Sequence, residues 1–137
     1  MEPLACPFET LDRLLEEAGR PKFCVVDFHA EATAEKKALA YYADGRISAL
    51  FGTHTHTQTA DEQILPNGLG YQTDLGMTGP AQSVIGIRPA QSIAKFRGEL
   101  TSRYEPADGP VQLCGAVFTV DTRTRRCTNV ERVKLLD

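Results

Sequence analysis

A strand–helix–strand pattern in the first half of the chain most constrains the fold. Two short apolar runs, residues 23–28 and 47–51, each predict a buried strand. Residues 34–43 between them predict a helix, with Thr33 as its cap and Asp44-Gly45 as its end. Strands joined in this way are parallel neighbours with a right-handed crossover. The sequence therefore predicts an α/β fold built around a parallel pair of strands.

Further elements are predicted on both sides of this unit. Residues 7–19 read as an amphipathic helix that starts at a proline and ends at a glycine. Residues 91–100 predict a short helix, and residues 111–121 and 127–135 predict an antiparallel hairpin that turns near residues 122–126. An alanine-rich helix face (Ala34 and Ala38, with Tyr42) is expected to pack on a sheet. Residues 60–89 are rich in glycine and proline, which predicts a long functional loop with some ordered apolar pieces.

Length and composition bound the class of protein. The 137 residues are expected to form a single domain, 1–137. The net charge of −3 gives no basis for specific nucleic-acid binding, so the cluster of Arg123, Arg125 and Arg126 reads as a solvated turn. No apolar run is long enough to span a membrane, and the N-terminus does not resemble a signal peptide. The four cysteines form no close pair, which favours buried free thiols in a reducing cytoplasm.

The three histidines of the chain follow the two predicted parallel strands. His29 comes just after the first strand, and His54 and His56 come just after the second. In open α/β sheets this edge is where ligands bind. On extended backbone His54 and His56 point the same way, with side chains starting roughly 6.5–7 Å apart, so each could serve a different metal ion. Three imidazoles at one edge are a plausible start on a metal site.

Other interpretations of these residues stay open. The His-x-His pair could be a polar strand edge, and His29 alone could be a hydrogen-bonded structural residue. Asp27, Glu31 and Asp74 are candidates for orienting an imidazole from outside the ligand shell. Asp61 and Glu62 are nearby as well, although Glu62 is better read as a loop charge or a helix cap. The phosphate-loop lysine motif, the nucleophile elbow and the dinucleotide fingerprint are absent from the sequence.

Three blocks of sequence resemble a known family. DFHAEATAEK at 27–36, GTHTHTQTAD at 52–61 and TDLGMTGP at 73–80 are similar, in order and spacing, to blocks of the YmdB-like metallophosphoesterases. These are bacterial members of the calcineurin-like superfamily, regarded as cyclic-nucleotide phosphodiesterases. The resemblance runs from about the first residue to the end of the chain.

The resemblance implies a fold and an activity. The fold is the C-terminal part of a calcineurin-like β-sandwich flanked by helices, with an antiparallel hairpin at its end. The implied activity is hydrolysis of cyclic nucleotides such as 2',3'- or 3',5'-cAMP by a hydroxide bound to two divalent metal ions (Fe, Mn or Zn). By the match, His29 and His54 are ligands of one metal and His56 is a ligand of the other.

The resemblance also implies that half of the site is missing. Family members have N-terminal blocks that supply an aspartate, a metal-bridging acidic residue, an asparagine ligand and a neighbouring histidine, and none has a counterpart here. The chain is therefore expected to be a fragment or a truncated product, inactive alone, and to form homo-oligomers or to associate with the missing half. Two alternatives remain: a catalytically dead interaction or oligomerisation module, and a mononuclear zinc domain that uses the three histidines with a carboxylate or water.

Overall fold

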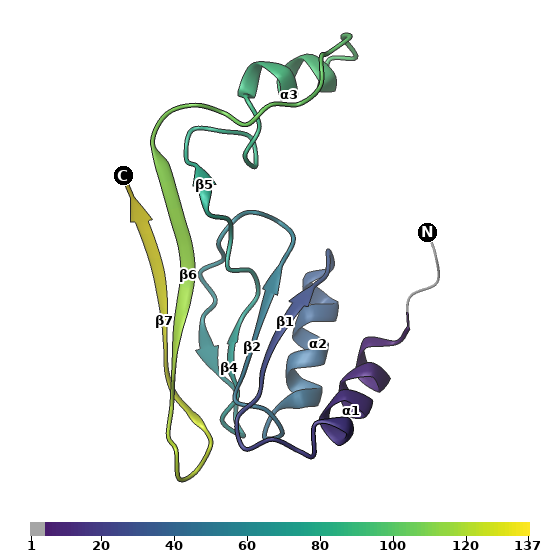
Figure 1. Ribbon diagram of the computed structural model, residues 1–137, viewed down its shortest axis with the longest axis vertical. Coiled ribbons are helices and arrows are strands. Elements are labelled where there is room, and N and C mark those ends of the chain that lie inside the picture. The colour runs from purple at the N-terminus through teal and green to yellow at the C-terminus, as the bar shows by residue number, and fades with distance from the viewer. Residues whose placement is uncertain (1–4) are drawn as a thin grey trace.

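The computed structural model describes residues 5–137 and consists of helices and two β-sheets (Figure 1). None of the helices in this part of the chain combines the length and the apolar character needed to cross a membrane. The elements follow in chain order: α1 (Pro7–Glu17), β1 (Val25–His29), α2 (Thr33–Ala43), β2 (Ala49–Thr53), β3 (Gln63–Ile64), β4 (Gly70–Gln72), β5 (Gly79–Pro80), α3 (Pro89–Phe96), β6 (Val111–Val120) and β7 (Cys127–Leu136).

The first sheet has the strand order β1-β2-β4-β3. β1, β2 and β4 are parallel, and only the short β3 runs the other way. The predicted parallel pair is therefore confirmed: His29 at the end of β1 lies beside Thr53 at the end of β2. Both strands begin about two residues later than expected, because the hydrogen-bonded ladder starts at Val25 and Ala49.

The two faces of the first sheet have different neighbours. Leu50 points toward α1 and α2 and is fully buried in the main core. Phe51, the next residue, points the other way and stacks on Phe118 of β6 with ring centroids 6.3 Å apart. Figure 1 shows the resulting order of layers, with α1 and α2 on one side of the first sheet and β6 and β7 on the other.

The two N-terminal helices differ from the prediction in detail. α1 ends at Glu17, and Gly19, as expected, closes it in the left-handed region with φ 68°. In α2 Thr33 is the first helical residue and makes no capping hydrogen bond, so its predicted capping role is wrong. The predicted packing face is also wrong, because Ala34 and Ala38 are exposed. The face that packs on the sheet is formed by Lys36, Leu39, Ala40 and Ala43.

The second sheet has the order β5-β6-β7 and contains the predicted hairpin. The prediction for residues 60–89 needs correction, since three short strands, β3, β4 and β5, lie in that stretch. β4 is the most buried of them, and tertiary pairing with β2 gives it its strand geometry. The helix predicted at 91–100 begins earlier, at Pro89, and ends at Phe96.

Close packing joins the two sheets at one glycine and one cysteine. A Cβ atom at Gly70 would come within 2.6 Å of the Cys127 sulfur and 2.8 Å of the Phe118 ring, so only glycine fits there. All four cysteines are free thiols, but the expectation that they are buried holds only for Cys127. Cys6 is exposed, and Cys24 and Cys114 are partly buried. Burial raises the pKa of the Cys127 thiol.

Candidate functional site

The carboxyl ends of β1 and β2 bring two of the three histidines into contact. His29 Nε2 and His54 Nδ1 are 3.1 Å apart, and the two rings meet edge to face with centroids 5.0 Å apart. The contact follows from the parallel register, which places His29 beside Thr53, the residue before His54. The sequence predicted this meeting from the strand–helix–strand pattern alone.

A short hydrogen-bond chain orients the His29 ring. The Thr53 hydroxyl donates to Asp27 Oδ1 at 3.1 Å and lies 3.1 Å from His29 Nδ1. Because the hydroxyl proton is directed to Asp27, its oxygen is left to accept a hydrogen bond from Nδ1–H of His29. This arrangement leaves the lone pair of His29 on Nε2, the nitrogen that faces His54. Asp27 thus acts on His29 through Thr53, and no sequence pattern marks Thr53 for this role.

His54 has a carboxylate on its other side. His54 Nε2 lies 3.2 Å from Glu31 Oε2, and the Glu31 side chain is largely exposed. This contact holds the ring between Glu31 and His29. A carboxylate that accepts from one ring nitrogen directs the lone pair to the other nitrogen, as is typical of histidine ligands to metals.

His56 lies apart from this pair. Its Nδ1 donates to the carbonyl oxygen of Ile85 at 3.0 Å, which joins the histidine loop to the segment after β5. His54, His56 and Ile85 all have left-handed backbone, with φ of 128°, 61° and 48°. Non-glycine residues rarely adopt this conformation, and such strain is concentrated at functional sites. The extended backbone assumed for residues 54–56 was therefore wrong, because the chain turns sharply at both histidines.

A buried ion pair supports the histidine loop from below. Lys36 Nζ of α2 lies 3.0 Å from Asp74 Oδ2, and neither side chain is exposed. The backbone N–H groups of Thr55 and Gly76 also donate to the Asp74 carboxylate, both at 2.9 Å. Burial alone would raise the pKa of Asp74, but the hydrogen bonds from Thr55, Gly76 and Lys36 hold it below its ordinary value. Asp74 therefore fixes Thr55, the residue between the two histidines, and its carboxylate forms no hydrogen bond with either ring.

Lys36 was not predicted as part of this region. Its position in the middle of an otherwise apolar helix face could have indicated a buried partner. The Lys36 side chain passes so close to Gly52 that only glycine fits at position 52. A Cβ atom there would come within 2.7 Å of the Lys36 side chain and would also collide with the carbonyl oxygen of Thr73.

The donor set at the sheet edge can be compared with the needs of a metal ion. Ligand distances of about 2.0–2.1 Å place two nitrogens on one ion roughly 3.0–3.4 Å apart, and the His29–His54 separation of 3.1 Å fits this range. Within residues 5–137, no group of three or more His, Cys, Asp or Glu side chains is arranged around a common point that could hold an ion. The pair of imidazoles thus suits part of a coordination shell, and other donors would have to complete it.

A cavity of about 500 Å³ opens beside His56. His56, Met77 and Ile85 lie on one side of it. Residues from the second sheet lie on the other, including Cys114, Arg132 and Lys134. Arg132 approaches Glu62 at 3.6 Å. A recess of this size beside His56, with two cations in its wall, can accommodate a small anionic molecule.

Two solved structures resemble this fold throughout. A hypothetical protein from Thermus thermophilus is 41% identical and has a TM-score of 0.86. The match covers 100% of this chain and 53% of that one. A structure described as a novel phosphatase from Mycoplasma pneumoniae is 40% identical, with a TM-score of 0.88. The match covers 95% of this chain and 46% of that one.

Sequence comparison gives the same result. A 2',3'-cyclic-nucleotide 2'-phosphodiesterase from Bacillus subtilis is 45% identical over 138 residues, which is 100% of this chain and 52% of the relative. A putative phosphatase/phosphodiesterase from Mycoplasma pneumoniae is 39% identical over 137 residues and is covered to 49% of its length. The chain thus spans about half the length of these relatives. Residues 1–133 match the family described as YmdB-like protein, and the chain belongs to this family.

Proposed function

We propose that this chain carries the histidine part of the active site of a metal-dependent phosphodiesterase that acts on cyclic nucleotides such as 2',3'- or 3',5'-cAMP. In this proposal the two sheets are the C-terminal part of a calcineurin-like sandwich. His29 and His54 would hold one divalent metal ion (Fe, Mn or Zn), and His56 would hold a second. The relatives' names support phosphoric ester hydrolysis, and the substrate named for the Bacillus subtilis relative suggests the cyclic nucleotide.

One observation carries the proposal: the 3.1 Å separation of His29 Nε2 and His54 Nδ1. The neighbours of both rings direct proton-bearing nitrogens away from this contact, Nδ1 of His29 toward Thr53 and Nε2 of His54 toward Glu31. Two lone pairs directed at the same space repel each other unless a cation or a proton lies between them. A metal ion shared by the two imidazoles satisfies both.

The residues of this chain would have distinct tasks. A bound pair of metal ions would activate water and neutralise charge on the phosphoryl group. Asp27 and Thr53 orient His29, Glu31 orients His54, and Asp74 fixes the loop between the histidines. Arg132 and Lys134 in the cavity beside His56 would attract the anionic substrate. The groups that bridge the metals and protonate the leaving group would come from a second chain segment, so we expect this chain alone to be inactive.

A second candidate function is an interaction module. The observation that favours it is an apolar groove of about 610 Å³ between α1 and β1, lined by residues that include Leu14, Val25 and Val26. Val25 is 59% exposed, and β1 pairs with a strand on only one side in the described part of the chain. Either another copy of the chain or the half that the relatives have in addition could pair with this edge.

Metal titration of the purified chain separates these candidates. Calorimetry with Mn²⁺ and Zn²⁺ should show binding that is weakened at least about tenfold by His29→Ala or His54→Ala. His56→Ala tests whether the site binds one metal ion or two. In a dinuclear site this substitution removes the second binding event and leaves the ion at His29 and His54 in place. Gln63→Ala, on the short β3, is the control outside the histidine loop. Metal affinity unchanged in both His29→Ala and His54→Ala would rule out the proposed centre and favour the interaction module.

Activity is tested with the complementing half present. The chain should show no turnover of 2',3'-cAMP by itself, and turnover should appear when the remaining half of the Bacillus subtilis relative is added in trans. General acid–base assistance alone contributes about 10²–10⁴-fold, so the two conditions are readily distinguished. Turnover by the isolated chain that disappears in His56→Ala would contradict the expected inactivity.

A further inference from the structure

A groove rich in arginine lies at the end of the first sheet opposite the histidines. Two adjoining cavities of about 580 and 630 Å³ share Pro21, Arg46 and Arg125. The segments that precede β1, β2 and β4 line them, together with the turn between β6 and β7. Six cationic residues line what we call the basic groove: Arg20, Lys22, Arg46, Arg123, Arg125 and Arg126.

The basic groove reverses the charge of the molecule locally. It holds six of the 15 lysines and arginines, and three carboxylates also line it, those of Asp12, Glu16 and Asp44. The lining thus has a formal charge of +3, six cations less three carboxylates. The whole chain carries −3, which leaves −6 on the remainder. A positive recess on an acidic protein attracts anions selectively to that place.

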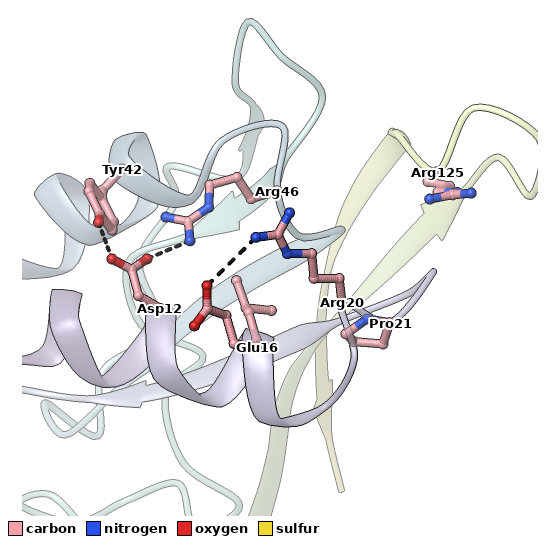
Figure 2. A pocket seen from close by; sticks show the side chains of 8 residues that line it. Asp12, Glu16, Arg20, Pro21, Tyr42, Arg46 and Arg125 are labelled. Atoms are coloured by element: carbon pink, nitrogen blue, oxygen red, sulfur yellow. Dashed lines mark hydrogen bonds and ion pairs between the residues drawn. The ribbon is translucent and has the colours of Figure 1, made fainter.

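Neighbouring groups hold several of these arginines in position. Arg46 Nη2 contacts Asp12 Oδ1, and its guanidinium lies over the Tyr42 ring, 5.0 Å from the centroid. Arg20 reaches Glu16 at 3.6 Å, so each of the two arginines pairs with a carboxylate of α1 (Figure 2). Each of these pairs uses few of the five N–H donors of its arginine, which leaves donors for a ligand.

The β6–β7 turn supplies the other arginines from a well-fixed backbone. The Asp121 carboxylate accepts hydrogen bonds from the backbone N–H groups of Arg123 and Thr124 at 2.8 and 2.7 Å. The side chain of Arg126 packs where Gly68 lacks a Cβ atom. No carboxylate of residues 5–137 lies within ion-pair distance of Arg123 or Arg125.

Backbone strain is concentrated at the two ends of this sheet. Five non-glycine residues of the described chain have left-handed backbone, and three of them, His54, His56 and Ile85, belong to the candidate metal centre. The other two are Arg20 and Arg125, both in the basic groove, with φ of 53° and 65°. Glycine or asparagine would fit these positions with less strain, so an arginine at either position carries a cost in backbone conformation.

We propose that the basic groove binds a small anion with adjacent phosphoryl groups, such as inorganic tripolyphosphate or a nucleoside triphosphate. Five of its six cations are arginine, whose planar donors match phosphate oxygens. The cations line two adjoining recesses of about 580 and 630 Å³, which suit a compact ligand. Tyr42 is the one aromatic residue among the lining residues and Arg46 already lies over its ring, so the recess has no row of aromatic side chains on which successive nucleic-acid bases could stack.

Calorimetry on the full 137-residue chain in EDTA tests the proposal. Tripolyphosphate should bind, and the double variant Arg123→Ala/Arg125→Ala should weaken binding about tenfold or more, as expected when hydrogen bonds to a charged ligand are lost. The matched control Arg13→Ala/Arg97→Ala removes the same charge outside the groove and should change the affinity less than about twofold. His29→Ala should leave binding unchanged, which separates this result from the fate of the proposed metal centre.

The ligand panel and a second variant make each result decisive. ATP binding equal to tripolyphosphate would support recognition of phosphoryl groups alone, and tighter ATP binding would support a nucleoside triphosphate. If the alanine variant does not fold, Arg123→Lys/Arg125→Lys retains the charge and should still weaken binding through loss of paired donors. Absence of tripolyphosphate and ATP binding, equal loss in the Arg13→Ala/Arg97→Ala control, or binding of an oligonucleotide alone would overturn the proposal.

Discussion

At the carboxyl end of the first sheet, the histidine loop rests on a fully buried ion pair, whereas at the amino end Arg20 and Arg46 are held by exposed carboxylates. The Lys36 and Asp74 side chains are inaccessible, while those of Asp12 and Arg46 are 43% and 38% exposed. Buried charges depend strictly on their partners, and exposed charges are stabilised by water as well. The first region is therefore a rigid support built into the core, and the second is an adjustable surface. Substitutions at the carboxyl end should therefore lower the stability of the protein more than substitutions at the amino end.

The largest effect is expected from separating the buried pair. Asp74→Ala leaves the Lys36 ammonium without its partner inside the protein and should cost about 3–5 kcal/mol in the free energy of unfolding. Urea denaturation measures this. Lys37→Met is the matched control, because Lys37 pairs with Asp61 at 3.7 Å near the surface. If Asp74→Ala lowers the free energy of unfolding no more than the control does, the buried Lys36–Asp74 pair does not stabilise the carboxyl end of the sheet.

A methyl group at Gly52 should have the next largest effect. Gly52→Ala pushes against the Thr73 carbonyl and the Lys36 side chain, and overpacking of this kind costs about 1–3 kcal/mol. Gly115→Ala is a strand control with open space around its added Cβ atom and should be close to neutral. Thermal denaturation of both variants provides the comparison. Equal melting temperatures would indicate that the backbone around Gly52 shifts to accommodate the added methyl group.

Acid should weaken the carboxyl end through Asp74 and Asp61. For Asp61, burial alone would raise the pKa, but bonds from Thr73 and Thr59 and the charge of Lys37 lower it, and the pKa of Asp74 is also lowered. A folded-state pKa below the ordinary value of 3.8 means that the stabilisation is complete above 3.8 and is lost as the pH falls through the folded value. Urea denaturation at pH 6 and at pH 3 measures how much of the free energy of unfolding is lost on acidification. This loss should be smaller in Asp74→Asn than in the unmodified chain.

The smallest effect is expected at the amino end. Asp12→Asn weakens contacts to Arg46 and Tyr42, all at the surface, and should lower the melting temperature only slightly. Added salt should reduce the difference further, because exposed charges are screened. A decrease as large as that of Asp74→Ala would remove the contrast between the two ends of the sheet.

The sequence predicted the parallel pair and the hairpin because their signals are local. Apolar runs, turn residues and the length of the connecting helix are enough to bring His29 and His54 to one edge. The packing face of α2 was missed because its centre is Lys36, a charged residue that is buried only through Asp74, 38 residues away. Propensity does not reveal such a pair, since the partner is chosen by the tertiary fold.

The geometry of the histidine loop was the least predictable part of the site. Its residues have β-forming neighbours, yet the backbone turns at His54 and His56 because Asp74 binds the N–H of Thr55 and Ile85 binds His56. The roles of His29, His54 and His56 as metal ligands remain predictions. The same is true of the assignment of residues 1–137 to a single domain and of the identity of the metals.

Gln58, three residues from Thr55, fastens the histidine loop to the second sheet. Its side-chain amide donates to the carbonyl oxygens of Gly115 in β6 and Val133 in β7, at 3.0 and 2.9 Å, across 57 and 75 residues of chain. Contacts between such distant residues form late in folding, because long loops must first close. During synthesis, the loop with two of the histidines leaves the ribosome before β7, so it gains its hydrogen bond to Val133 only when β7 has docked.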